Sequence, residues 1–150
     1  MFIGSYPGTM DDKGRTTIPA KMRNTLGERI ILVKGLDECL YIFTEPEWQI
    51  YYENHIANRE TSDVKARKLE RFFSSSAMEC GIDRQGRINI PDDYLKHSSI
   101  EKDVFFASCG NHIEVWDKAK FDEEMSSISA EISDLMHDAE KTPTKDSDGV

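Results

Sequence analysis

Short apolar stretches, turns and a short helical stretch alternate along the first third of the chain. Two β-type stretches flank the sequence Asp11-x-x-Gly14, which favours a hairpin because glycine accepts a positive φ angle. A proline then opens a short helix, and Gly27 stands just past its end, where glycine commonly terminates helices. Two further β-rich stretches follow. The elements predicted for this part are strands at residues 2–10 and 15–18, a helix at 19–26, and strands at 29–33 and 39–43.

The second half of the chain repeats this pattern. Residues 11–19 return at 83–91 with the same Asp, Gly, Arg, Ile and Pro, at an offset of 72. We therefore expect a second short helix at 91–97 and strands at 104–107 and 113–116. The chain is predicted to be an α+β protein built from two β-β-α-β-β units. Because a unit of this size buries little core by itself, we expect both units to fold as one body.

A longer helical stretch is predicted after each unit. Thr44 and Pro46 open the first one, which reaches about residue 58, and a basic segment at 64–73 starts from Thr61 or Ser62. After the second unit, Asp117 is expected to cap a helix. The apolar residues of that helix step by four and three, a spacing that core packing explains: Phe121, Met125, Ile128, Ile132 and Leu135.

These elements divide the chain into five parts. They are a first repeat at 1–45, a helical linker at 46–71, a second repeat at 72–116, a C-terminal helix at 117–140 and a polar tail at 141–150. The tail lacks large apolar residues apart from its last one, so we expect it to be disordered.

The net charge of −9 is concentrated in the last thirty residues. Residues 121–150 hold nine acids and two bases, a net of −7, which leaves −2 for residues 1–120. A nearly neutral body can carry a local basic patch, and the local field decides phosphate binding. Between Lys13 and Arg23 there are four bases and no acid. The chain has no long apolar run and no secretion signal, so we expect a cytoplasmic protein.

No residue pattern points to a metal, a cofactor or a catalytic centre. Cys39, Cys80 and Cys109 form no Cys-x-x-Cys pair, and the four histidines lack metal-ligand spacing. The run Ser74-Ser75-Ser76 lacks the glycines of a nucleophile elbow, and no phosphate-binding or zinc-protease motif is present. We therefore expect no cofactor and no enzyme activity.

The repeated motif Asp-x-x-Gly-Arg carries the candidate chemistry. Its aspartate can bond main-chain N–H groups of its own turn or hold the arginine, while the glycine permits a tight turn. The planar guanidinium then makes paired hydrogen bonds to phosphate oxygens or to a guanine edge. The alternative is an ion pair that only stiffens the turn. The candidate DNA contacts are Arg15, Arg87, Lys13, Arg84, Lys21 and Arg23, supported by Asp11, Gly14, Asp83 and Gly86.

Taken together, these residues resemble the MraZ family of bacterial transcriptional regulators, within the superfamily of AbrB-like swapped-hairpin DNA-binding proteins. The similarity covers roughly residues 1–140. It rests on the start Met1-Phe2-x-Gly4, both Asp-x-x-x-Arg motifs, Arg71-Phe72-Phe73, and Asn111-x-Ile113-Glu114-Val115-Trp116.

The resemblance implies a double-split β-α-β fold, a ring-shaped homo-oligomer, and binding to short direct repeats upstream of a division and cell-wall gene cluster. It implies that the DNA-facing surface includes Asp11, Lys13, Arg15, Asp83 and Arg87.

The sequence departs from this pattern at two places. Asp12 adds an acid to the first motif, and Gln85 replaces the base found at Lys13, so we expect the two motifs to read DNA differently. The acidic tail lies outside the shared core. We expect it to repel DNA, so that its removal raises DNA affinity.

We therefore expect a nucleoid-associated, sequence-specific DNA-binding regulator that represses its own gene cluster. Its partners are double-stranded DNA and further copies of itself, with no membrane and no small-molecule substrate. An alternative is an antitoxin-like protein-interaction module whose acidic tail binds a basic partner. An enzyme of undetected type is a further alternative, for which the sequence shows no motif.

Overall fold

The computed structural model describes residues 1–57 and 59–142. Within these residues the chain forms a six-stranded antiparallel sheet, a two-stranded ribbon and six helical segments. In chain order the elements are β1 (Ser5–Thr9), β2 (Arg15–Thr17), α1 (Ala20–Leu26), β3 (Arg29–Lys34), β4 (Leu40–Phe43), α2 (Glu45–Tyr52), a π-helical turn η1 (Glu53–Ala57), α3 (Val64–Ser76), β5 (Met78–Gly81), β6 (Arg87–Asn89), α4 (Asp92–Ser98), β7 (Asp103–Cys109), β8 (His112–Asp117) and α5 (Lys118–Glu140).

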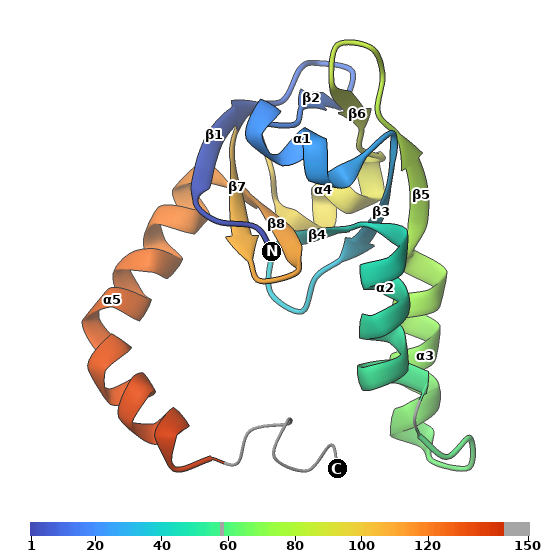
Figure 1. The fold of residues 1–150 in the computed structure, drawn as a ribbon, viewed down its shortest axis with the longest axis vertical. Coiled ribbons are helices and arrows are strands. Elements are labelled where there is room, and N and C mark those ends of the chain that lie inside the picture. Colours follow the sequence, from blue (N-terminus) through green and yellow to red (C-terminus); the bar gives the residue numbers. More distant parts are fainter. Residues whose placement is uncertain (58, 143–150) are drawn as a thin grey trace. The chain divides into compact units, whose positions relative to one another are not determined.

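The two repeats exchange their first strands. The sheet order is β1-β7-β8-β4-β3-β5, so β1 of the first repeat pairs with β7 of the second, and β5 pairs with β3. The strands β4 and β8 join the two halves at the centre. Because each half completes the sheet of the other, residues Met1–Lys118 form one compact unit (Figure 1). The expectation that both repeats fold as one body is confirmed.

The predicted local hairpin between the first two strands of each repeat is confirmed at its turn, where the N–H groups of Asp11 and Asp83 donate to the carbonyls of Arg15 and Arg87, but the strands do not continue as a paired ladder. The strand β2 pairs with β6 of the other repeat, and the bridge Met10–Thr16, together with the hydrogen bond from the hydroxyl of Thr16 to the carbonyl of Thr9, joins it to the chain before the turn. The strand β6 is equally short and pairs with β2 over all three of its residues. Figure 1 shows the two motif turns side by side at one end of this unit.

Most helix ends follow the expected residues. Gly27 ends α1 at φ 78°, and its N–H donates to the carbonyl of Arg23. The hydroxyl of Thr44 accepts the N–H of Glu47 at the start of α2. The start expected at Thr61 or Ser62 is wrong, because Asp63 caps α3. A carboxylate is the stronger acceptor for the exposed N–H groups of a first turn.

The main core lies between one face of the sheet and the layer formed by α1, α4 and the ribbon. Both short helices contribute buried residues to it, and so do the inward side chains of the ribbon. The largest fully buried members of this core are Phe106, Ile18, Met22, Ile30, Leu32, Leu40, Ile42, Ile88, Ile90 and Ile113. Apolar packing of its inward side chains therefore anchors the ribbon to the core.

The opposite face of the sheet packs against α2 and α3. The ring of Phe43 lies 5.4 Å from that of Trp48 and 5.1 Å from that of Tyr51, and Tyr51 lies 6.1 Å from Phe73. Such edge and tilted contacts stabilise aromatic clusters beyond simple burial. Because both faces are covered, every residue of β4 is buried.

The helix α5 belongs to a second unit that begins at Ala119. No residue of α5 is buried, and Met125, Ile132 and Leu135 are 44%, 56% and 45% exposed. The expectation that core packing explains its apolar stripe stays a prediction. The carboxylate of Asp117, expected to cap this helix, accepts the N–H of Glu101. No helix of the described part has the length and apolar character needed to cross a membrane. Most of the predicted tail, 143–150, lies outside the described residues.

Candidate nucleic-acid interface

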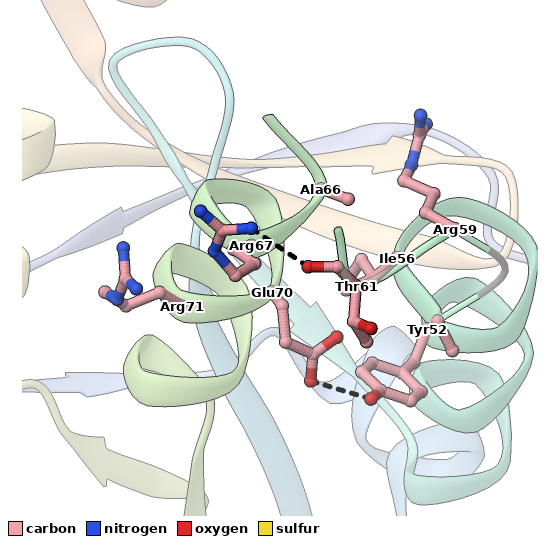
Figure 2. Close-up of a pocket in the computed structure, with 9 residues that line it drawn as sticks. Tyr52, Ile56, Arg59, Thr61, Ala66, Arg67, Glu70 and Arg71 are labelled. Atoms are coloured by element: carbon pink, nitrogen blue, oxygen red, sulfur yellow. Dashed lines mark hydrogen bonds between the residues drawn. The ribbon is translucent and has the colours of Figure 1, made fainter. Parts of the chain in front are cut away.

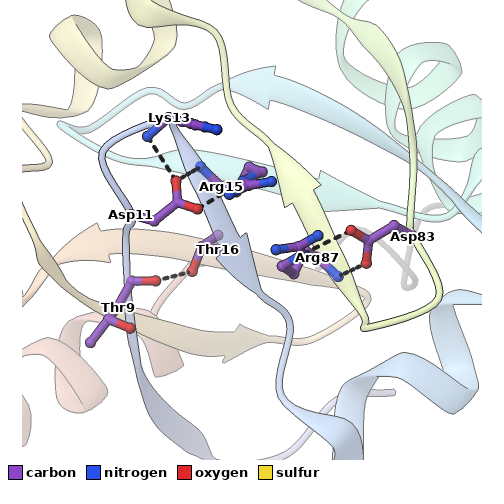
Figure 3. A network of polar contacts seen from close by, with 7 residues as sticks. All are labelled: Thr9, Asp11, Lys13, Arg15, Thr16, Asp83 and Arg87. Atoms are coloured by element: carbon purple, nitrogen blue, oxygen red, sulfur yellow. Dashed lines mark hydrogen bonds and ion pairs between the residues drawn. The ribbon is translucent and has the colours of Figure 1, made fainter.

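The ribbon β2–β6 brings the two motif arginines onto one exposed face. Arg15 pairs with Asn89, and Thr17 pairs with Arg87. Side chains alternate along a strand, and directly paired residues share a face. The middle pair, Thr16 and Ile88, is buried, so the outer pairs face solvent. As diagonal neighbours the two arginines are about 7–8 Å apart at their Cα atoms. Figure 3 shows both on adjacent antiparallel strands.

Each motif aspartate bonds both its own turn and its arginine. Asp11 Oδ1 accepts the N–H groups of Lys13 and Arg15 at 2.9 and 2.8 Å, and Oδ2 accepts Nε–H of Arg15 at 2.8 Å (Figure 3). In the second repeat, Asp83 accepts the N–H groups of Gln85 and Arg87 at 2.9 and 2.8 Å, and Nε–H of Arg87 at 2.9 Å. The sequence left open whether the aspartate bonds the turn or the arginine, and the structure shows both in each copy.

These hydrogen bonds keep both aspartates ionised. The main-chain N–H of Arg15 has the largest effect in holding the pKa of Asp11 below its ordinary value of 3.8. The main-chain N–H of Arg87 has the same effect on the pKa of Asp83. Because all four side chains are about a third exposed, these ion pairs contribute little to global stability, and their effect is to fix position.

The terminal nitrogens of both guanidinium groups remain available. The aspartates engage Nε, and no acceptor among residues 1–57 and 59–142 bonds Nη1 or Nη2 of Arg15 or Arg87. A guanidinium anchored at one edge keeps a fixed orientation, and its two terminal N–H groups match a phosphate or the O6 and N7 atoms of guanine.

The glycine of each motif ties its turn to the other repeat. Gly14 and Gly86 have φ angles of 78° and 79°, a backbone region that residues with a side chain rarely adopt. The carbonyl of Gly14 accepts the N–H of Ile90 at 2.7 Å, and the carbonyl of Gly86 accepts the N–H of Ile18 at 2.8 Å. Each turn is thus held in place by the residue that directly follows the ribbon strand of the other repeat.

The sequence repeat matches a known protein family. A family model described as "MraZ protein, putative antitoxin-like" matches the chain twice, over residues 1–72 and 73–144. The chain belongs to the MraZ family. Together with the exchanged strands, the two matches confirm the predicted family and the predicted repeat-built α+β fold.

Several similar proteins are named Transcriptional regulator MraZ. The one from Alkaliphilus oremlandii is 43% identical over 137 residues, which cover 91% of this chain and 95% of that protein. The one from Limosilactobacillus fermentum is 38% identical over 135 residues, covering 90% and 94%. The one from Caldanaerobacter subterraneus is 39% identical over 135 residues, with the same coverage.

The other basic candidates of this MraZ family member lie in different surroundings. Lys13 and Arg84 are exposed beside the aspartates of the two turns. Arg23 is used within the protein, because its Nη1 donates to the carbonyl of Gln85 in the second turn at 3.3 Å. Lys21 lies on α1 with Nζ 5.8 Å from the ring of Tyr6, off the ribbon.

Two residues of the exposed ribbon face were missed by the sequence analysis. Thr17 and Asn89 are exposed and share the face of Arg15 and Arg87. Their spacing of two from each arginine was visible in the sequence. Recognising that all four share one face required knowledge that β2 pairs with β6, which no local pattern reveals.

One group of possible metal ligands was also missed. Ligand atoms of Cys109, His112 and Glu114 lie within 4.8 Å of one another on the β7–β8 hairpin, and Glu114 also accepts Nε1–H of Trp116. Burial lowers the pKa of His112, which favours its neutral, metal-binding form. The spacing of three and two residues resembles no zinc motif, so this group could not be recognised from the sequence. This end of β7 is remote from the motif turns, and we assign the group no role in DNA recognition.

Proposed function

We propose that this MraZ family member is a sequence-specific DNA-binding transcriptional regulator that contacts DNA through the outer face of the β2–β6 ribbon. The observation that carries the proposal is the pair of guanidinium groups fixed at Nε on one exposed face, with their terminal nitrogens unbonded in the described structure. Relatives with 37% to 43% identity named as transcriptional regulators support it.

A two-stranded ribbon is a suitable reading element for duplex DNA, because the major groove admits it. On this ribbon Arg15 and Arg87 are the principal contacts, reaching base edges or phosphates, and Lys13 and Arg84 add phosphate contacts. Asn89 stands beside them with an amide that can pair with the adenine edge. The surrounding charge is small: Asp83, Arg84 and Arg87 sum to +1, and the first motif with Asp11, Asp12, Lys13 and Arg15 sums to zero.

Such a site binds weakly as a single copy, which favours an assembly. A few phosphate contacts and one or two base contacts do not give tight specific binding at physiological salt. Linked copies on matching direct repeats can raise affinity by about 10²–10⁴ without new contacts. We therefore infer a ring-shaped homo-oligomer acting in the cytoplasm on the nucleoid, which binds direct repeats upstream of its own division and cell-wall cluster and represses it.

The decisive experiment measures binding of the purified protein to duplex DNA from upstream of its own gene. Arg15→Ala and Arg87→Ala should each weaken binding about 10-fold or more, since a good bidentate base contact contributes about 1–3 kcal/mol. Arg29→Ala is the matched control, because Arg29 is an exposed arginine on β3 whose guanidinium pairs with Glu79. Unchanged binding in both motif variants, with the oligomer intact, would overturn the proposal.

The antitoxin-like alternative is favoured by one observation, the strongly acidic and unburied helix α5. Under that alternative a basic protein would co-purify with the full chain and be lost when α5 is truncated. The ribbon variants would then leave that complex unchanged, which separates this function from DNA binding.

A further inference from the structure

The helices α2, η1 and α3 enclose a groove on the main unit. The groove has a volume of about 440 Å³ and is lined by residues of these helices and of the loop between them (Figure 2). Ile56 and Ala66 form an apolar floor and are nearly buried. Three arginines stand around this floor: Arg59, Arg67 and Arg71. An apolar floor with a basic rim fits an amphipathic helix that carries acids beside its apolar stripe.

The basic rim lacks acidic partners within the part of the chain that the structure describes. None of the three arginines forms an ion pair there, although Arg67 donates to the carbonyls of Thr61 and Ser62 at 3.0 and 3.2 Å. The one carboxylate lining the groove, Glu70, accepts the hydroxyl of Tyr52 at 2.7 Å. The helix α3 itself carries four bases and one acid, so the groove is positively charged.

The helix α5 has the complementary character. It carries seven acids and two bases, and none of its residues is buried. At 3.6 residues per turn, Met125, Ile132 and Leu135 fall on one face, and Glu124 and Glu131 lie along the edge of that face. The stripe from 125 to 135 is about 16 Å long, and the thirteen residues of α3 span about 20 Å. On α3 the groove is lined from Ala66 to Arg71, about 8 Å of helix, so the groove receives part of the stripe and the match rests on charge.

We propose that α5 of one copy docks in the α2–η1–α3 groove of a second copy and that this contact builds the oligomer. The inference rests on the assembly inferred under the proposed function. Each copy offers one helix and one groove, so the contact is heterologous, and a heterologous contact repeated around a closing rotation gives a ring. Phosphate binding is the main rival for the groove. The apolar floor favours a helix over DNA.

Paired charge reversals test the contact in the full chain. The helix variant is Glu124→Lys with Glu131→Lys, and the groove variant is Arg67→Glu with Arg71→Glu. The matched control, Glu123→Lys with Asp134→Lys, makes the same charge change on the opposite face of α5. Light scattering after gel filtration should show loss of the large species for the helix and groove variants and an unchanged mass for the control.

Mixing the helix and groove variants separates docking between copies from docking within one chain. The reversed helix of one variant matches the reversed groove of the other, and the two unchanged partners match as well, so an alternating ring should reappear on mixing. No recovery on mixing, with both variants folded by circular dichroism, would overturn the proposal. Loss of DNA binding by the groove variant at unchanged mass would assign the groove to DNA instead. Neither outcome depends on Arg15 or Arg87, so failure here leaves the ribbon proposal testable.

Discussion

The guanidinium of Arg23 in the first repeat lies directly against Gly86 in the second. A Cβ placed on Gly86 would lie 1.8 Å from Nη1 of Arg23. The same Nη1 donates a hydrogen bond to the carbonyl of Gln85, which holds the guanidinium at this position. The first turn differs, because a Cβ on Gly14 would lie 2.8 Å from the main-chain oxygen of Ile90. The glycines of the two turns thus pack against different groups, a side chain at Gly86 and the main chain at Gly14.

This difference predicts unequal effects of alanine at the two glycines. Both variants suffer from the positive φ angle, at about 1–2 kcal/mol. Gly14→Ala also clashes with main chain that the ribbon holds fixed, whereas Gly86→Ala can displace the flexible end of Arg23. We expect Gly14→Ala to be the more destabilising in chemical denaturation. Gly81→Ala is the control, since nothing lies within 4 Å of its added Cβ. Equal losses for Gly14→Ala and Gly86→Ala would contradict this account.

The aspartates predict an acid-dependent effect. In the folded chain the pKa values of Asp11 and Asp83 lie below the ordinary 3.8, so their stabilising effect is present above about pH 4 and lost as pH falls through the lowered values. Asp11→Asn with Asp83→Asn should therefore lower the melting temperature at neutral pH, and the difference from the unchanged chain should shrink near pH 2. The same variant should weaken DNA binding at neutral pH, because Nε loses its anchor. If the difference in melting temperature is as large near pH 2 as at neutral pH, the hydrogen bonds assigned to the ionised aspartates are not its cause.

The sequence predicted more about elements than about their partners. The repeat of Asp, Gly and Arg identified both motif turns, and Pro19 and Gly27 correctly placed α1, because these are local effects of backbone geometry. The pairing of β2 with β6 was not predictable, because strand partners across 72 residues depend on the whole sheet. The stripe of α5 has a normal core period, and that period does not tell which surface the stripe packs against.

Arginine-to-lysine changes test whether DNA binding depends on the planar donors of the guanidinium as well as on its charge. Arg87→Lys keeps a cation but lacks Nε–H and the planar pair of terminal donors, so it cannot bond Asp83 and a guanine edge together. We expect a reduced preference for native over shuffled DNA, with a loss of about 1–3 kcal/mol on the native site. Arg29→Lys should leave both affinities unchanged. If Arg87→Lys binds like the unchanged chain, the residue contributes charge alone.

Salt dependence separates base reading from phosphate binding on the ribbon. Arg84 is exposed beside the second turn, and a phosphate contact there should make Arg84→Ala weaken native and shuffled DNA equally and reduce the slope of log K against log salt by about 0.9. Asn89 is an exposed residue of β6 on the same ribbon, and its side chain has no charge to release counterions. Asn89→Ala should therefore keep the slope and weaken native DNA selectively. A changed salt slope for Asn89→Ala, or a lost preference for native DNA with Arg84→Ala, would reverse the two roles. The reason is that the salt slope reports the number of phosphates neutralised, whereas the preference for native DNA reports contacts to base edges.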